Sequence, residues 1–197
     1  NYKQNDLFRG DQSSWHLNAC VGKNGGPYNL FDYARGYFLA SEKLIDNLKH
    51  NGNNYIDILI YPICFSFRHG LELYLKYFSE KFPQILRNTQ PIRMTHKLTD
   101  NWNLIKSNIC DIPEFDQDEM ERKTLHIEKI LLDLVEIDPS GEVFRYPESK
   151  DRKRYLQETS VINLLVLGSL LKDLQEVLEF LVNSIDWLLE KRRVEQM

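Results

Sequence analysis

Residues 67–76 have the sequence Phe-Arg-His-Gly-Leu-Glu-Leu-Tyr-Leu-Lys, in which charged groups and a histidine interrupt an apolar run. Arg68, Glu72 and Lys76 are four residues apart, so they fall on one stripe of a helix. The stretch therefore predicts a helix packed against other helices, whose polar stripe is either an ion-pair ladder or one side of a site between helices. The apolar positions recur at the three- and four-residue spacing of a buried helix face, at Ile63, Phe67, Leu71, Tyr74, Leu75 and Phe78.

Helical periodicity continues on both sides of this stretch. Pro62 lies inside the second expected helix and is expected to kink it or to mark the start of its second half, and Pro83 is expected to follow its end. A turn sequence, an extended segment and Pro147 predict an irregular or hairpin excursion near 138–156. The expected fold class is all-α, a bundle of about five helices with this small excursion. The expected helices cover about 30–50, 54–81, 98–105, 116–135 and 158–191.

The N-terminal part of the chain differs in character from the rest. Residues 1–28 are polar, end in glycines and a proline, and show no sustained periodicity. We expect an irregular lead-in that packs on the domain through Phe8 and Trp15. Residues 29–197 are then one helical domain, which agrees with the length of the chain.

Composition limits the classes of function and the compartment. The chain has 197 residues, 42% of them hydrophobic and 27% charged, as is usual for soluble globular proteins. The longest apolar stretch, 161–171, is interrupted and shorter than the roughly 20 residues that cross a bilayer. No signal-peptide pattern opens the chain, so we expect a cytoplasmic protein without membrane attachment. The three cysteines are isolated thiols and are expected to be buried.

Charge gives a mixed indication about nucleic acid. The net charge of -4 argues against general coating of the chain by RNA or DNA, although a local basic patch remains compatible with RNA binding. The basic tip, defined here as residues 150–154, is either a solvated turn or a contact for an RNA backbone. Its RNA-binding candidates are Lys150, Arg152, Lys153 and Arg154.

Metal and cofactor chemistry have little support. No two of the five histidines have the spacing that places two ligands on one helix face, so no metal site is expected. The glycines at 22–26 lack the lysine-serine ending of a phosphate-binding loop, and no cofactor is expected. What remains suits metal-free cleavage of a phosphodiester, in which an imidazole moves the proton of a ribose hydroxyl and an arginine stabilises charge on phosphate. The catalytic candidates are Arg68, His69, His96 and Arg145, with Glu72 orienting Arg68.

Each candidate also has a structural interpretation. His69 is equally expected as a partly buried helix residue, as histidines often are. His96 follows Thr95 and is compatible with a role in capping the short helix. Arg145, in an extended segment, is compatible with a pair to a helix carboxylate.

Taken together, these motifs resemble the HEPN superfamily, the nucleotide-binding domain of higher eukaryotes and prokaryotes. The similarity rests on Arg-His-Gly-Leu-Glu-Leu-Tyr-Leu-Lys at 68–76, Thr-His-Lys-Leu at 95–98 and Phe-Arg-Tyr-Pro at 144–147, and it covers roughly 30–190. It implies a bundle of about four to five helices, frequent homodimerisation with a site at the dimer cleft, and in many members metal-independent RNase activity. Such members act in toxin–antitoxin, phage-defence or RNA-processing systems.

One motif of active members is missing. They have an arginine followed after about four to six residues by a histidine, near the start of the last core helix. Here Arg93 and His96, and likewise Arg122 and His126, are too close, and Asp151 stands where a partner of Arg145 would be.

Two hypotheses follow from this departure. The first is an RNA-cleaving endoribonuclease effector, a homodimer with RNA as substrate and an antitoxin or defence-complex protein as partner. The second is a non-catalytic HEPN-like binding or scaffold module that binds RNA, nucleotide or a partner protein. A purely structural helical domain within a larger assembly is the third alternative.

Overall fold

The structure is a computed structural model that describes residues 5–24, 26, 28–51, 54–86, 92–95 and 97–195. Within these residues the secondary structure is helical, with no β-strand. The predicted all-α bundle of about five helices is therefore confirmed. The elements are the 3-10 helix η1 (Trp15–Leu17) and the α-helices α1 (Leu30–Asn51), α2 (Ile56–Ile85), α3 (Leu98–Cys110), α4 (Gln117–Ile137) and α5 (Leu164–Val194).

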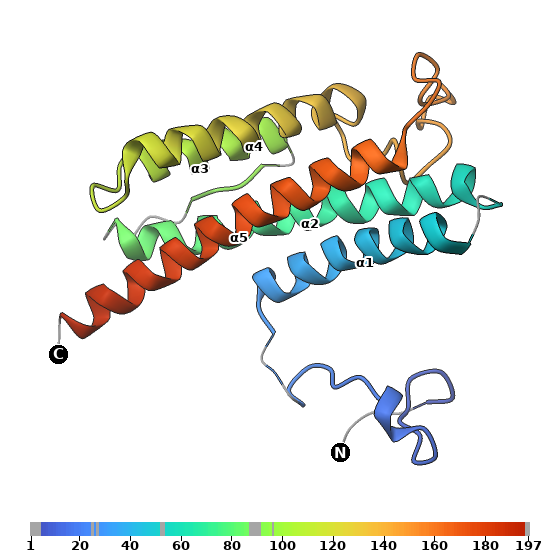
Figure 1. Cartoon of the computed structure of the whole chain (residues 1–197), viewed down its shortest axis with the longest axis horizontal. Helices are drawn as coiled ribbons and strands as arrows, with labels where there is room; N and C mark the ends of the chain where they lie inside the picture. The colour runs from blue at the N-terminus through green and yellow to red at the C-terminus, as the bar shows by residue number, and fades with distance from the viewer. Residues whose placement is uncertain are drawn as a thin grey trace.

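The second helix is the centre of the bundle. It runs antiparallel to α1 and contacts α3 and α5, while α4 packs against α3 and α5 (Figure 1). At Gly70 an added Cβ would lie 2.6 Å from the Phe38 ring and 3.1 Å from the Ala34 carbonyl oxygen, so the absence of a side chain allows α1 to approach. The predicted apolar face of α2 is buried, at Ile63, Phe67, Leu71, Tyr74, Leu75 and Phe78.

Two predicted helix ends are wrong, each for a local reason. The second helix continues past Pro83 to Ile85, because Phe82 and Ile85 are fully buried and their packing holds the last turn in the helix. The helix also runs continuously through Pro62. The last helix begins at Leu164, not near residue 158, because the Asn163 side chain accepts hydrogen bonds from the first free backbone N–H groups of α5.

The start of α4 agrees with the sequence. The Asp116 side chain accepts a hydrogen bond from the Glu119 backbone N–H at 3.1 Å, which is the capping arrangement expected from these two residues. This helix continues to Ile137, two residues beyond the expected end.

The chain between α4 and α5 forms the predicted excursion. Glu148 and Arg154 make an isolated antiparallel bridge, and the Tyr155 N–H donates to the Pro147 carbonyl oxygen at 3.1 Å. The short hairpin therefore closes directly after Pro147. In Figure 1 the excursion projects from the end of the bundle at which α2 and α5 begin.

The lead-in does not use its expected anchors. Phe8 and Trp15 are 71% and 72% exposed, so the prediction that they pack on the domain is wrong. The described segment satisfies its polar groups locally, since Asp11 accepts the Ser14 backbone N–H at 2.8 Å and exchanges hydrogen bonds with Asn18. This local closure leaves its apolar side chains in solvent.

The cysteines divide between interior and surface. Cys64 is buried in α2, and burial together with the Asp138 charge raises the pKa of its thiol to about 12. Cys20 and Cys110 are exposed, so the expectation of burial is wrong for these two. Among the described helices, none has the length and apolar content needed to cross a membrane.

Candidate functional site

Arg68, the first charged residue of the polar stripe, points into the protein. Its side chain is 7% exposed, and its Nε lies 3.3 Å from Oδ2 of Asp138, whose side chain is 1% exposed. The same Nε donates to the Asp138 carbonyl oxygen at 3.4 Å. The guanidinium therefore joins α2 to the residue that ends α4, and it is not free to bind phosphate at the surface.

Asp138 also organises the turn that opens the excursion. Its Oδ1 accepts the backbone N–H of Gly141 at 2.7 Å and that of Val143 at 3.2 Å. Gly141 has φ +79°, and a Cβ there would lie 2.5 Å from Nη1 of Arg68. Only glycine combines this backbone conformation with such close contact to the guanidinium. The Arg68–Asp138 pair thus fixes the start of the excursion on α2.

The rest of the stripe forms the predicted ion-pair ladder. Oε2 of Glu72 lies 3.7 Å from Nη1 of Arg68, and its Oε1 accepts from Nζ of Lys76 at 2.8 Å. Burial raises the pKa of Glu72, but the hydrogen bond and charge of Lys76, with the charge of Arg68, hold it below its ordinary value. Glu72 is therefore ionised at neutral pH, and its carboxylate contacts the Arg68 guanidinium.

His69 faces a different surface from Arg68. Its imidazole stacks on the Phe65 ring, with centroids 5.8 Å apart, and meets the Tyr37 ring edge-on at 4.6 Å. Burial lowers the pKa of His69, Glu72 opposes this shift, and the charges of Lys76, Arg68 and Arg145 add to it. Because the net shift is downward, the ring is neutral at pH 7 and can accept a proton.

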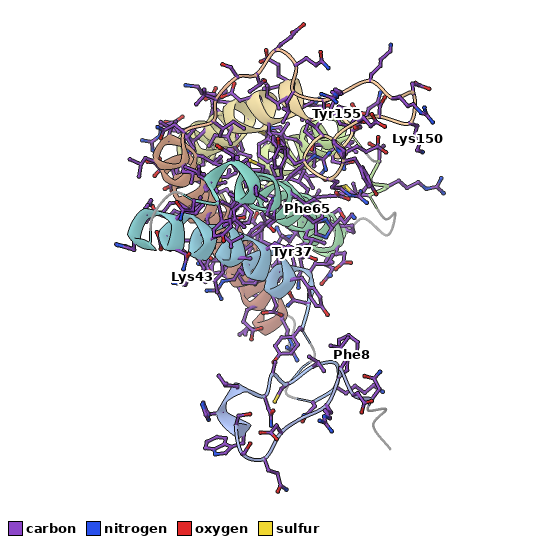
Figure 2. All side chains as sticks on the ribbon, turned by 90° about the vertical axis from the view of Figure 1, so that its right-hand side faces the viewer. Phe8, Tyr37, Lys43, Phe65, Lys150 and Tyr155 are labelled. Carbon is purple, nitrogen blue, oxygen red and sulfur yellow. The ribbon has the colours of Figure 1, made fainter. Side chains whose placement is uncertain are left out.

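Arg145 lies on the same face as His69 and is exposed. Its Cζ is 5.8 Å from the centroid of the Phe65 ring and 5.1 Å from that of Tyr146, and its Nη2 donates to the Tyr146 hydroxyl at 3.2 Å. Figure 2 shows Phe65 between Tyr37 of α1 and the excursion that bears Tyr155. We call the surface formed by Phe65, His69, Arg145 and Tyr146 the aromatic face.

The remaining sequence candidates are placed as follows. Lys150, Arg152, Lys153 and Arg154 are all exposed on the hairpin of the excursion, and Arg152 has φ +58°. His96 lies outside the described residues. Arg68, His69, Glu72 and Arg145 are thus brought to one region of the bundle, but Arg68 is turned inward.

Sequence reasoning missed the aromatic partners and Asp138. Phe65 is one helical turn before His69, and Tyr146 directly follows Arg145, so their proximity could have been inferred from spacing. The role of Asp138 could not, because it depends on how α4 ends over α2. In the described part of the chain, no group of three or more His, Cys, Asp or Glu side chains is arranged to hold a metal ion.

Comparison with protein-family models, curated proteins and solved structures finds no match to this chain.

Proposed function

We propose that this chain is a HEPN-like module that binds single-stranded RNA through the aromatic face. The observation on which the proposal rests is the position of Arg145, an exposed guanidinium between the rings of Phe65 and Tyr146. A guanidinium in such a place can bind phosphate with two donors, and the half-exposed Tyr146 ring offers a stacking surface to an unpaired base. Neither contact depends on the base sequence of the RNA.

The basic tip extends this surface. Its Lys and Arg side chains are exposed on the excursion that also holds Arg145. An RNA backbone that runs from Arg145 along the excursion would be attracted by these charges, which would add a salt-dependent part to the affinity. A local patch of this kind is compatible with the overall charge of -4.

Metal-independent cleavage of the bound RNA is the second candidate, favoured by the lowered pKa of His69. A neutral imidazole on the same face as Arg145 has the protonation state of a general base, while Arg145 is available for the phosphate. Because Arg68 is buried in its ion pair, this version of the site has one arginine fewer than the sequence suggested. The geometry therefore favours binding over cleavage.

The binding proposal is tested by fluorescence anisotropy with a labelled, unstructured RNA at several salt concentrations. Arg145→Ala should weaken binding about tenfold, or 1.4 kcal/mol, and lower the salt slope by about 0.7. Arg193→Ala is the matched control, since this arginine is 78% exposed near the far end of α5. Equal losses in the two variants would mean that the aromatic face is not the binding site.

Cleavage is tested on the same RNA in buffer containing a metal chelator. Product that forms with the wild type and disappears with His69→Gln, at unchanged RNA affinity, would support the endoribonuclease hypothesis. Binding without product would leave the non-catalytic module. Expression in cells tests the proposed role in a toxin–antitoxin or defence system. Toxicity of the wild type that is absent with His69→Gln would support this role, and a harmless wild type would contradict it.

The partner predictions belong to the same proposal. The expected partners are a second copy of this chain, in a homodimer, and an antitoxin or defence-complex protein. Light scattering of the purified chain measures the first of these directly, and a monomeric mass at working concentration would contradict it.

A further inference from the structure

A cavity of about 360 Å³ lies directly beside Arg145. This volume is within the range of small-molecule sites in proteins, and the lining combines aromatic rings with one charged group, as such sites usually do. Most of the lining comes from the two limbs of the excursion, and Tyr61 of α2 supplies the rest. The lining residues are Tyr61, Val143, Phe144, Arg145, Tyr146, Pro147, Tyr155 and Leu156.

Three tyrosines from separate segments meet around this cavity. Tyr61 of α2 is 44% exposed and Tyr146 of the first limb is 49% exposed, so both residues are accessible from solvent. Tyr155 of the second limb is held by its hydroxyl, which donates to Oε2 of Glu142 at 3.2 Å. Accessible rings of this kind are stacking surfaces for a planar ligand.

The backbone at the cavity shows strain. Leu156 has φ +56°, a left-handed conformation that is unfavourable for leucine, and it is one of the residues that line the cavity. Leu156 and Tyr155 also line an adjoining cavity of about 570 Å³ that reaches the start of α5. Strain of this sort persists where the surrounding structure fixes a residue, and ligand sites are common among such places.

From these observations we infer that the cavity is a pocket for one unpaired nucleobase, whose nucleotide phosphate binds the Arg145 guanidinium. The inference deepens the proposed function and rests on it, because it assigns a base-binding pocket to the same RNA-binding surface. The aromatic lining selects a planar ring, and Arg145 in the same lining selects an anionic ligand, so a nucleoside phosphate matches both.

The test separates base binding from backbone binding. The probes are two single strands of about ten abasic nucleotides, identical except that one has a central adenine. With the wild type we expect the adenine-bearing strand to bind at least about fivefold more tightly, which is the lower end of the effect of stacking one base. Tyr146→Leu should reduce this ratio to near one. Tyr33→Leu, a 58% exposed tyrosine of α1 outside the cavity, should leave the ratio unchanged.

The outcomes distinguish the pocket from the proposed function. If both strands bind the wild type equally, the pocket inference is overturned while RNA binding stands. If neither strand nor unstructured RNA binds, the proposed function fails, and titration with adenosine monophosphate decides the pocket alone. Binding of adenosine monophosphate to the wild type that is lost in Tyr146→Leu would support the pocket. Absence of adenosine monophosphate binding to the wild type would overturn it. Tyr61→Leu is the second variant should Tyr146→Leu fail to fold.

Discussion

Replacing Arg68 with methionine should cost much of the stability of the protein. The substitution keeps an unbranched apolar stem but leaves the Asp138 carboxylate, which is 1% exposed, without its guanidinium partner at 3.3 Å. Removal of one partner from a buried ion pair typically costs about 3 to 5 kcal/mol. Because Glu72 loses a contact with Arg68 as well, we expect a loss within this range and not below it.

The measurement is the free energy of unfolding from urea titration, followed by far-ultraviolet circular dichroism at neutral pH. A second variant, Arg68→Met with Asp138→Asn, removes both charges. Its asparagine oxygen still accepts the Gly141 and Val143 N–H groups, so the turn is retained. Since a buried pair replaced as a whole often costs little, the double variant should recover at least about 1 kcal/mol relative to Arg68→Met.

Two results would refute this reasoning. A loss below about 1 kcal/mol in Arg68→Met would mean that the pair behaves like an exposed one. The single variant Asp138→Asn completes the comparison. If the free energy of unfolding lost in the double variant equals the sum of the losses in Arg68→Met and Asp138→Asn, the two residues do not interact energetically.

Three further predictions concern local features. Gly141→Ala should destabilise the protein by about 1 to 2 kcal/mol because of the φ of +79° alone, and by more because the added Cβ would contact Arg68. The measurement is the melting temperature, which should fall. An unchanged melting temperature would contradict the turn at Gly141. The lowered pKa of His69 means that the folded state binds fewer protons than the unfolded state, so the free energy of unfolding should fall as pH drops below about 7. In urea titrations at several pH values, His69→Gln should show a weaker fall over this pH range. A fall equal to that of the wild type would exclude His69 as its source. Asn163→Ala should cost about 1 kcal/mol in thermal unfolding by removing the cap of α5, whereas the same change at exposed Asn103 should cost nearly nothing.

The helices were predictable because burial repeats along them. The apolar face of α2 from Ile63 to Phe78 is visible as spacing in the sequence and is buried in the structure. The errors at Pro83 and Asn163 have a different origin. Proline disfavours the interior of a helix, but tertiary packing can override this preference. Asparagine favours the N-cap position of a helix but is also found inside helices. Pro83 is held in the helix by its buried neighbours, and Asn163 caps α5 at a position that the sequence pattern places inside the last helix.

The candidate site was predictable only in part. Spacing placed Arg68, Glu72 and Lys76 on one stripe, and the ladder between them exists. Spacing could not show that Arg68 would find a carboxylate 70 residues further along the chain, because that contact depends on how α4 ends over α2. The position of Arg145 over the Phe65 ring depends in the same way on the fold of the excursion.

Arg68 and His69 are adjacent in sequence but serve different parts of the protein. Successive residues of a helix are about 100° apart, so one side chain can enter the interior while the next reaches the surface. Arg68 fixes Asp138 and the turn at Gly141, and Arg145 follows four residues later on the same excursion. His69 meets Phe65, the ring over which Arg145 lies. On the proposed function, Arg68 is therefore a positioning residue, because it acts on RNA only through the place it gives to Arg145. Arg68→Met should then lower RNA affinity at unchanged salt slope, whereas Arg145→Ala lowers both.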